Sequence, residues 1–201
     1  MFLLKLNTKG EQKEMANKKS RALTREQYQM IIDTIEQGFL IHGPNHRIAT
    51  ILKLEANLGL RLGDILHLRL SDIVFDAGRY RLNIVEEKTK KERCFTVPVE
   101  VVEYIRSYCK ENKIQDDQVI FPITEQAVNK HLRLVCDFLE LENVGSHSFR
   151  KFFATEIYLN NDYNIVLVQQ LLQHSSVAIT QRYVGVSNKQ IETALSNHIY
   201  L

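Results

Sequence analysis

Apolar residues recur at helical spacing along most of this chain. The first such run follows Thr24-Arg-Glu-Gln27, a capping box, so a helix is expected to begin there. A second helix is expected from about Asn45 to Leu58, with Gly59 placed to end it. A short helical turn is then expected to carry Arg61. Later helices are expected near residues 99–112, 124–140, 148–160, 164–173, 176–183 and 188–200.

One region of the chain instead has the period of a strand. Residues 79–84 alternate polar and apolar side chains, which is typical of a half-buried strand. A polar tip over residues 86–92 leads to a second strand, Arg93 to Val97, and a third short strand is expected near residues 73–75. These patterns predict an α+β fold that is mainly helical, with a small antiparallel β-sheet.

Length and composition fit one ordinary globular domain. The chain has 201 residues, of which 44% are hydrophobic and 25% charged. Residues 1–22 are polar and Lys-rich, so a basic arm or linker is expected there, ahead of a single domain over residues 23–201. No apolar run approaches the roughly 20 residues that span a bilayer. We therefore expect a cytoplasmic protein without membrane association.

The cysteines and the net charge further limit the class of protein. The three cysteines lie far apart and form no C-x-x-C pair, which fits a reducing compartment and predicts three buried thiols with no zinc site. The formal net charge is only +2. Basic clusters at residues 1–25 and 88–93 are, on composition alone, better explained as a solvated tail and a charged hairpin tip than as a phosphate-binding surface.

Several polar residues beside apolar stretches are candidates for chemistry. Arg61 is flanked by apolar residues, and alone it is best explained by a salt bridge to Asp64, one helical turn further on. The alternative explanation is that Asp64 orients the guanidinium of Arg61 toward a phosphate. His147-Ser-Phe-Arg150 would lie on the first turn of a helix, where backbone N–H groups attract anions. Taken singly, this pair, His174 and Tyr183 are each better explained as structural.

Their combination is more specific than any one of them. A phosphodiester can be opened without a metal ion if a nucleophile attacks in line, cations neutralise the equatorial oxygens and an acid protonates the departing oxygen. The chain supplies two arginines, two histidines, a lysine at a hairpin tip and a tyrosine. No cofactor and no metal ion are expected, because no carboxylate or His/Cys cluster is evident in the sequence.

The order of these residues resembles the active-site series of the tyrosine site-specific recombinases, the phage integrase family. The segment GLRLGDILHLRLSDI is similar to the family's first-arginine motif, HSFRKFFAT to its His-x-x-Arg box, and LLQHSSVAITQRYVGV to the stretch that joins the second histidine to the nucleophile. The resemblance runs from about Leu23 to the end. It implies the tyrosine-recombinase catalytic domain fold and an enzyme that cleaves and rejoins DNA without metal or ATP.

The resemblance also implies a role for each catalytic residue. Tyr183 would attack the scissile phosphate and form a 3′-phosphotyrosine. Arg61 and Arg150 would clamp the non-bridging oxygens. His147 would assist proton transfer, and His174 would hydrogen-bond the phosphate.

The lysine and the supporting residues are less firmly assigned. Lys88, on the hairpin tip, would protonate the leaving 5′-oxygen, with Lys90 as second choice and Lys91 on the same tip. Asp64 would orient Arg61, and it stands where many members have glutamate. Lys151, which stands where histidine is frequent, and Arg182 are expected to support the site or to contact DNA.

The resemblance implies partners as well. Double-stranded DNA is the expected substrate, in the nucleoid, and self-association in a tetrameric synapse through the last helix is expected. The apolar stripe of that helix, which includes Ile191 and Leu195, could equally pack on its own core. Most members carry a further N-terminal DNA-clamping domain that residues 1–22 cannot form, so the chain is either a fragment or a short stand-alone member. The alternative functions are a type IB topoisomerase-like activity and a catalytically idle DNA-binding regulator.

Overall fold

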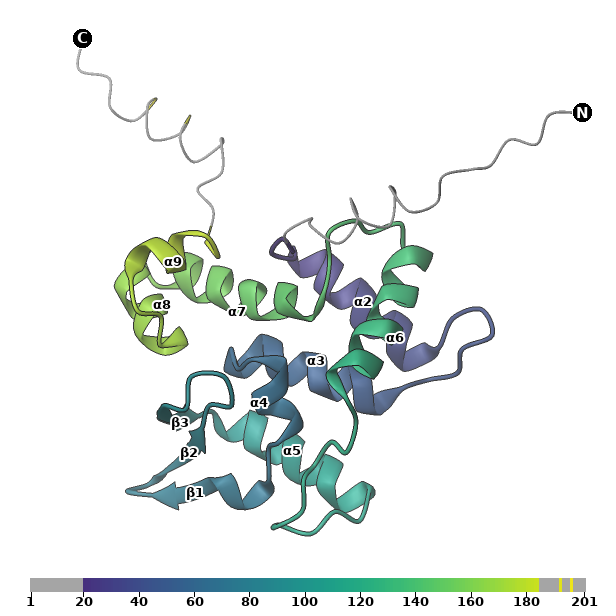
Figure 1. The fold of residues 1–201 in the computed structure, drawn as a ribbon, viewed down its shortest axis with the longest axis horizontal. Helices are drawn as coiled ribbons and strands as arrows, with labels where there is room; N and C mark the ends of the chain where they lie inside the picture. The colour runs from purple at the N-terminus through teal and green to yellow at the C-terminus, as the bar shows by residue number, and fades with distance from the viewer. Residues whose placement is uncertain (1–19, 185–191, 193–195, 197–201) are drawn as a thin grey trace, which may run out of the picture.

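The computed structural model describes residues 20–184 together with residues 192 and 196, and its elements follow the predicted pattern closely (Figure 1). The helices are α2 (Arg25–Gln37), α3 (His46–Leu58), α4 (Leu62–Leu66), α5 (Val99–Glu111), α6 (Glu125–Phe138), α7 (Ser146–Asn160), α8 (Ile165–Leu172) and α9 (Val177–Gln181). The strands are β1 (Ile73–Asp76), β2 (Arg79–Val85) and β3 (Glu92–Val97), and a 3₁₀ turn, η1 (Leu70–Asp72), precedes β1. The predicted mainly helical α+β class is confirmed.

The ends of the first two helices are fixed by the residues that the sequence singled out. Thr24 and Gln27 form the expected capping box at the start of α2. The side chain of Asn45 accepts a hydrogen bond from the backbone N–H of Ile48 and so caps α3. Gly59 ends α3 in the left-handed conformation, with φ +58°, which glycine adopts without a steric penalty. The chain therefore turns sharply three residues before α4 begins at Leu62.

The three strands form one antiparallel sheet in the order β1-β2-β3. Leu82 is the fully buried residue of β2, and the neighbours that share its face pack against the core, as the alternation predicted. The turn between β2 and β3 is closed by two backbone hydrogen bonds, from Glu86 N–H to Lys91 O and from Lys90 N–H to Glu86 O, both 2.9 Å long. The tip of the hairpin is therefore an ordered turn rather than an open loop.

Two apolar clusters hold the described residues together. The large one is built around α3, most of whose residues are buried, and it joins α2, α4, α5, α6 and the sheet. The small one consists of Ala154, Val168, Leu172 and Val184 and lies where α7, α8 and α9 meet. Helix α7 packs along α3 and leads to α8 and α9, which lie on the same side of the molecule as the sheet (Figure 1).

Three expectations from the sequence have different outcomes in the structure. Cys109 and Cys136 are buried as predicted, but the prediction for Cys94 is wrong, because it lies on the exposed face of β3. Within the described residues, no helix is long and apolar enough to cross a membrane. The expected arm over residues 1–22 and the helix near residues 188–200 fall largely outside the described residues.

Candidate active site

Five of the six predicted catalytic residues line one pocket of about 670 Å³. They come from five separate segments: the end of the α3–α4 turn, the hairpin tip, the start of α7, the α8–α9 connection and the residues after α9. These residues are Arg61, Lys88, His147, His174 and Tyr183. The sixth, Arg150, is fully buried and is not part of the lining. The fold thus brings together side chains that are as much as 122 positions apart in the numbering of the chain.

Tyr183 lies between the two histidines. Its ring centroid is 5.0 Å from that of His147 and 4.6 Å from that of His174. The ammonium of Lys151 lies 5.6 Å from the same ring, close enough for a cation–π contact. The backbone N–H of Tyr183 donates to Thr180 O at 2.8 Å, so the residue is fixed to the end of α9. The phenol is consequently surrounded by groups that can exchange protons or stabilise negative charge.

Both imidazoles are neutral near pH 7. Burial lowers the pKa of His147 to about 4, and the charges of Arg150, Lys151 and Arg61 act in the same direction. Burial likewise lowers the pKa of His174 to about 4, together with the nearby arginines. A neutral ring has one nitrogen that can accept a proton and one that can donate.

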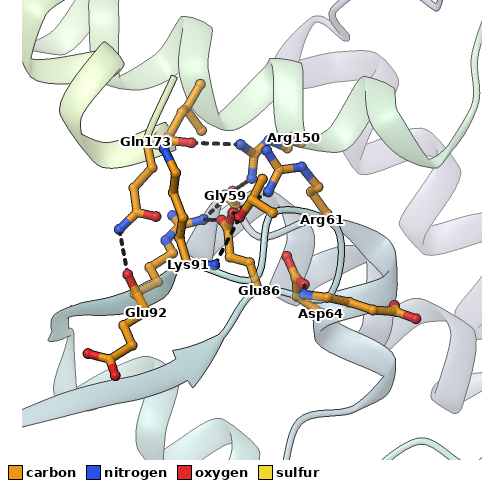
Figure 2. A network of polar contacts seen from close by, with 12 residues as sticks. Gly59, Arg61, Asp64, Glu86, Lys91, Glu92, Arg150 and Gln173 are labelled. Carbon is orange, nitrogen blue, oxygen red and sulfur yellow. Dashed lines mark hydrogen bonds and ion pairs between the residues drawn. The ribbon is translucent and has the colours of Figure 1, made fainter. Parts of the chain in front are cut away.

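The carboxylate that binds Arg61 is not the predicted one. Arg61 donates from Nη1 to Glu86 Oε2 at 2.5 Å, and Glu86 is only 1% exposed (Figure 2). Asp64 Oδ1 instead accepts a hydrogen bond from the backbone N–H of Glu87 at 2.8 Å. The prediction that Asp64 orients Arg61 is therefore wrong: Arg61 precedes the short helix as its N-cap, and its side chain turns toward the hairpin.

Glu86 joins several parts of the site. Its Oε2 also accepts a hydrogen bond from the Thr89 hydroxyl at 2.7 Å, and its Oε1 accepts one from Arg93 at 3.3 Å. Burial alone would raise the pKa of this carboxyl, but the hydrogen bonds from Thr89 and Arg61 and the charges of Arg61 and Arg93 hold it below its ordinary value. Glu86 is thus an anion that connects the hairpin tip to two arginines.

Arg150 is held inside the protein. Its Nη1 donates to Gly59 O and its Nη2 to Leu172 O, the latter at 3.0 Å, while its buried Nε has no hydrogen-bond partner (Figure 2). Burial lowers the pKa of Arg150, as does the charge of Arg61, whereas Tyr183 opposes this shift. In this conformation the guanidinium faces backbone carbonyls and the phenol, not the open pocket.

Arg93 is a buried residue beside the pocket that the sequence did not single out. It is 2% exposed and donates to Leu58 O, Gly59 O and Leu171 O, in addition to Glu86. Burial lowers its pKa to about 10, and Arg150 adds to the effect. The alternation of side chains along β3 could have predicted its burial, because Arg93 lies on the same face of β3 as the buried Val97.

The hairpin tip separates the three candidate lysines. Lys88 and Lys91 both line the pocket that holds Tyr183. Lys90, which adopts φ +56° in the turn, instead lines a different pocket with Asp64 and Cys94. The ranking of Lys90 as second candidate is therefore not supported by the geometry, whereas Lys88 lies where it was expected.

The two remaining supporting candidates, Lys151 and Arg182, are not among the residues that line the pocket. Lys151 is half-buried, and its ammonium donates to the backbone carbonyl of Ser20. Arg182 is exposed and does not line the pocket. Glu55, which does line it, is 1% exposed, and its Oε2 has no hydrogen-bond partner. Burial raises the pKa of Glu55 well above its ordinary value, and Glu125 adds to the shift while Arg150 opposes it.

In the part of the chain that the structure describes, no three or more His, Cys, Asp or Glu side chains are grouped as a metal site requires. The metal independence of the reaction stays a prediction.

The fold matches that of solved recombinases. The XerA recombinase superposes with a TM-score of 0.67 at 21% identity, over 92% of this chain and 66% of that one. The catalytic domain of bacteriophage HP1 integrase superposes with a TM-score of 0.62 at 17% identity, over 90% of this chain and 96% of that one. The fold is therefore that of a tyrosine-recombinase catalytic domain.

Sequence comparison agrees. The chain is 30% identical over 145 residues to the probable integrase/recombinase YoeC of Bacillus subtilis, which covers 69% of this chain and 77% of that protein. It is 29% identical over 158 residues to tyrosine recombinase XerD of Staphylococcus aureus, covering 73% of this chain but only 52% of XerD. The sequence model of the phage integrase family matches residues 21–190, and the chain belongs to this family.

Proposed function

We propose that this chain is a site-specific DNA recombinase that cleaves and rejoins strands through a 3′-phosphotyrosine at Tyr183. The observation that carries the proposal is the position of the Tyr183 ring between two neutral imidazoles, in a pocket that Arg61 and Lys88 also line. A nucleophile, proton carriers and cations are the parts that metal-free phosphoryl transfer requires.

The proposed reaction has two balanced steps. In the first, the phenol oxygen of Tyr183 forms a bond to phosphorus while the bond from phosphorus to the 5′-oxygen breaks. The phenol proton passes to a basic group such as the free nitrogen of His147, and Lys88 gives a proton to the 5′-oxygen. In the second step a 5′-hydroxyl, the original or one from another strand, attacks the phosphotyrosine and gives its proton to Lys88, while His147 returns a proton to the released Tyr183 oxygen. The phosphoester bond is conserved, so no ATP is consumed.

The arginines would stabilise the charge that develops on phosphorus. Arg61 lines the pocket and is held by Glu86, so its guanidinium is oriented before DNA binds. Arg150 is enclosed beside Tyr183, so its proposed phosphate contact requires Arg150 to exchange its bonds to the carbonyls of Gly59 and Leu172. A conformational step on DNA binding is therefore part of the proposal.

The DNA partner and its assembly are also proposed. The XerH site-specific recombinase, which superposes with a TM-score of 0.71 at 21% identity over 90% of this chain, was solved in a post-cleavage complex with its palindromic difH substrate. We propose double-stranded DNA as the substrate here too, and pairing of protomers on it through the C-terminal segment. The chain spans about half the length of XerD.

The decisive experiment captures the covalent intermediate. Nicked duplexes with a randomised central segment are incubated with the protein in excess chelator, and adducts that survive denaturation are recovered and sequenced. Loss of the short fragment beside the nick prevents religation, so the adduct accumulates. The wild-type chain should form an adduct, and Tyr183→Phe should not, although its DNA affinity should be nearly unchanged because only a hydroxyl is removed.

Matched controls exclude trivial explanations. Tyr163→Phe removes a phenol from an exposed position outside the pocket and should leave the adduct yield unchanged. An adduct formed by Tyr183→Phe would refute the assignment of the nucleophile. Tight binding without any adduct would favour a catalytically idle regulator, and relaxation of supercoiled plasmid without exchange of strands would favour a topoisomerase-like activity.

A further inference from the structure

The side chain of Thr180 contacts the ring of His174 directly. Thr180 is fully buried in α9, and its Oγ1 lies 3.0 Å from His174 Nδ1. His174 lines the pocket beside Tyr183, and within the described part of the chain its second ring nitrogen, Nε2, makes no hydrogen bond. The contact at Nδ1 therefore determines what Nε2 can offer to a ligand.

The single proton of the Thr180 hydroxyl has two neighbouring acceptors. One is His174 Nδ1 at 3.0 Å, and the other is the carbonyl oxygen of Ser176 at 3.5 Å. The second distance is beyond the range of ordinary O–H···O bonds. The same carbonyl already accepts a hydrogen bond from the backbone N–H of Ile179 at 3.2 Å. The shorter contact favours donation of the hydroxyl proton to Nδ1, an arrangement that places the proton of the neutral ring on Nε2.

The opposite arrangement would leave a buried hydroxyl proton with only a long contact to an acceptor. If Nδ1–H donated to Thr180, the hydroxyl proton would depend on the distant Ser176 carbonyl, at a fully buried position. A doubly protonated ring is also disfavoured, because burial lowers the pKa of His174 and the charges of Arg150 and Arg61 act in the same direction. One tautomer of the neutral ring remains.

We propose that Thr180 is a positioning residue that holds His174 in its Nε2–H tautomer, so that the neutral ring donates a hydrogen bond to a phosphate oxygen. The role in phosphate binding rests on the proposed function, whereas the tautomer does not. Without Thr180, a neutral His174 could present a lone pair to the phosphate, and two negative surfaces would face each other.

The tautomer can be measured without DNA. Long-range ¹H–¹⁵N correlation spectra of protein labelled at histidine distinguish Nε2–H from Nδ1–H rings, and the His174 signals are assigned by their loss in His174→Gln. At neutral pH, His174 of the wild-type chain should be in the Nε2–H form. An Nδ1–H ring, or an even mixture of the two forms, would overturn the proposal.

Variants test whether Thr180 is the cause. Thr180→Val keeps the shape but removes the hydroxyl, and it should shift His174 toward a mixture of tautomers. Thr180→Ser restores the hydroxyl and should restore the Nε2–H form. Thr155→Val removes another hydroxyl near Tyr183, one that does not contact His174, and should leave the spectrum of His174 as in the wild type. A fully Nε2–H ring in folded Thr180→Val would refute the role of Thr180.

Cleavage of nicked DNA then links the tautomer to the reaction. Thr180→Val should slow adduct formation at saturating DNA by roughly 10-fold, with little change in DNA affinity, because one preorganised donor is weakened. In a His174→Gln background the same substitution should have no further effect. Equal slowing in both backgrounds would mean that Thr180 does not act through His174. A wild-type chain that never forms an adduct would refute the proposed function, while the spectra would still decide the tautomer.

Discussion

Replacing the buried Arg93 by methionine is a direct test of how the site is held together. Methionine keeps the unbranched aliphatic stem of arginine but removes its charge and all its donors. Arg93 links the end of α3, the end of α8 and the hairpin, through the carbonyls of Leu58 and Leu171 and the carboxylate of Glu86. The substitution should therefore destabilise the fold without opening a large cavity.

The size of the effect follows from the groups that lose a partner. Within the described residues, Leu58 O and Leu171 O accept hydrogen bonds from Arg93 alone, so both are left unpaired, at a cost of about 1–3 kcal/mol each. Glu86 keeps its bonds to other side chains and adds little. Removing a buried cation beside Arg150 recovers part of the loss. A net decrease of about 2–4 kcal/mol in the free energy of unfolding is expected.

Urea denaturation followed by far-UV circular dichroism measures this difference. The slope against urea should be unchanged, so that a lower midpoint reports lower stability. Arg81→Met is the matched control, because Arg81 pairs at the surface of β2, and its removal should leave the midpoint nearly unchanged. A loss below about 0.5 kcal/mol for Arg93→Met would show that its four hydrogen bonds do not hold the site, since such a value is typical of surface substitutions.

Three further predictions concern stability. Gly59→Ala should cost about 2–4 kcal/mol, because alanine is strained at φ +58° and its Cβ would lie 2.4 Å from the Phe153 ring; thermal unfolding measures this, and a loss below about 1 kcal/mol would contradict it. Because burial raises the pKa of Glu55, the wild type should lose stability relative to Glu55→Gln as pH rises above about 4.5, and parallel pH profiles would refute this. Because the pKa values of His147 and His174 are lowered to about 4, the free energy of unfolding should fall as pH drops from about 6.5 to 4. The decrease should be at most about 1.4 kcal/mol per pH unit for each ring, and less after solvent screening. A variant with both histidines replaced by glutamine and an equally steep pH profile would contradict this.

Much of the fold could be predicted because its signals are local. The capping box at Thr24, the Asn45 cap and the helix-ending Gly59 each act through backbone groups only a few residues away. The alternation over residues 79–84 also fixes which face of β2 is buried. Patterns of this kind depend on the geometry of one helix or strand, so the sequence alone is sufficient to recognise them.

The partners within the site could not be predicted in the same way. Local spacing favoured Asp64 for Arg61, whereas the actual partner, Glu86, arrives from a hairpin that folds back over the start of α4. The alternation of β2, continued by one step, would have placed Glu86 on the inward face, as it does Arg93 on β3. The pattern does not predict which buried charges form pairs, because the pairing depends on how separate helices and strands pack.

The carbonyl of Gly59 accepts hydrogen bonds from both Arg93 and Arg150. Helix α3 has no basic residue in its own last turn, so the negative end of its dipole is neutralised by cations from β3 and α7. Bringing those segments to the helix end carries the entropy cost of closing long loops, which only the packed domain repays. The proposed DNA chemistry needs this cluster of positive charge, which therefore forms only when folding is complete. A nascent chain that has been synthesised only as far as the start of α7 contains Arg61 but lacks Arg150 and Tyr183. Such a chain cannot break a DNA strand by this chemistry.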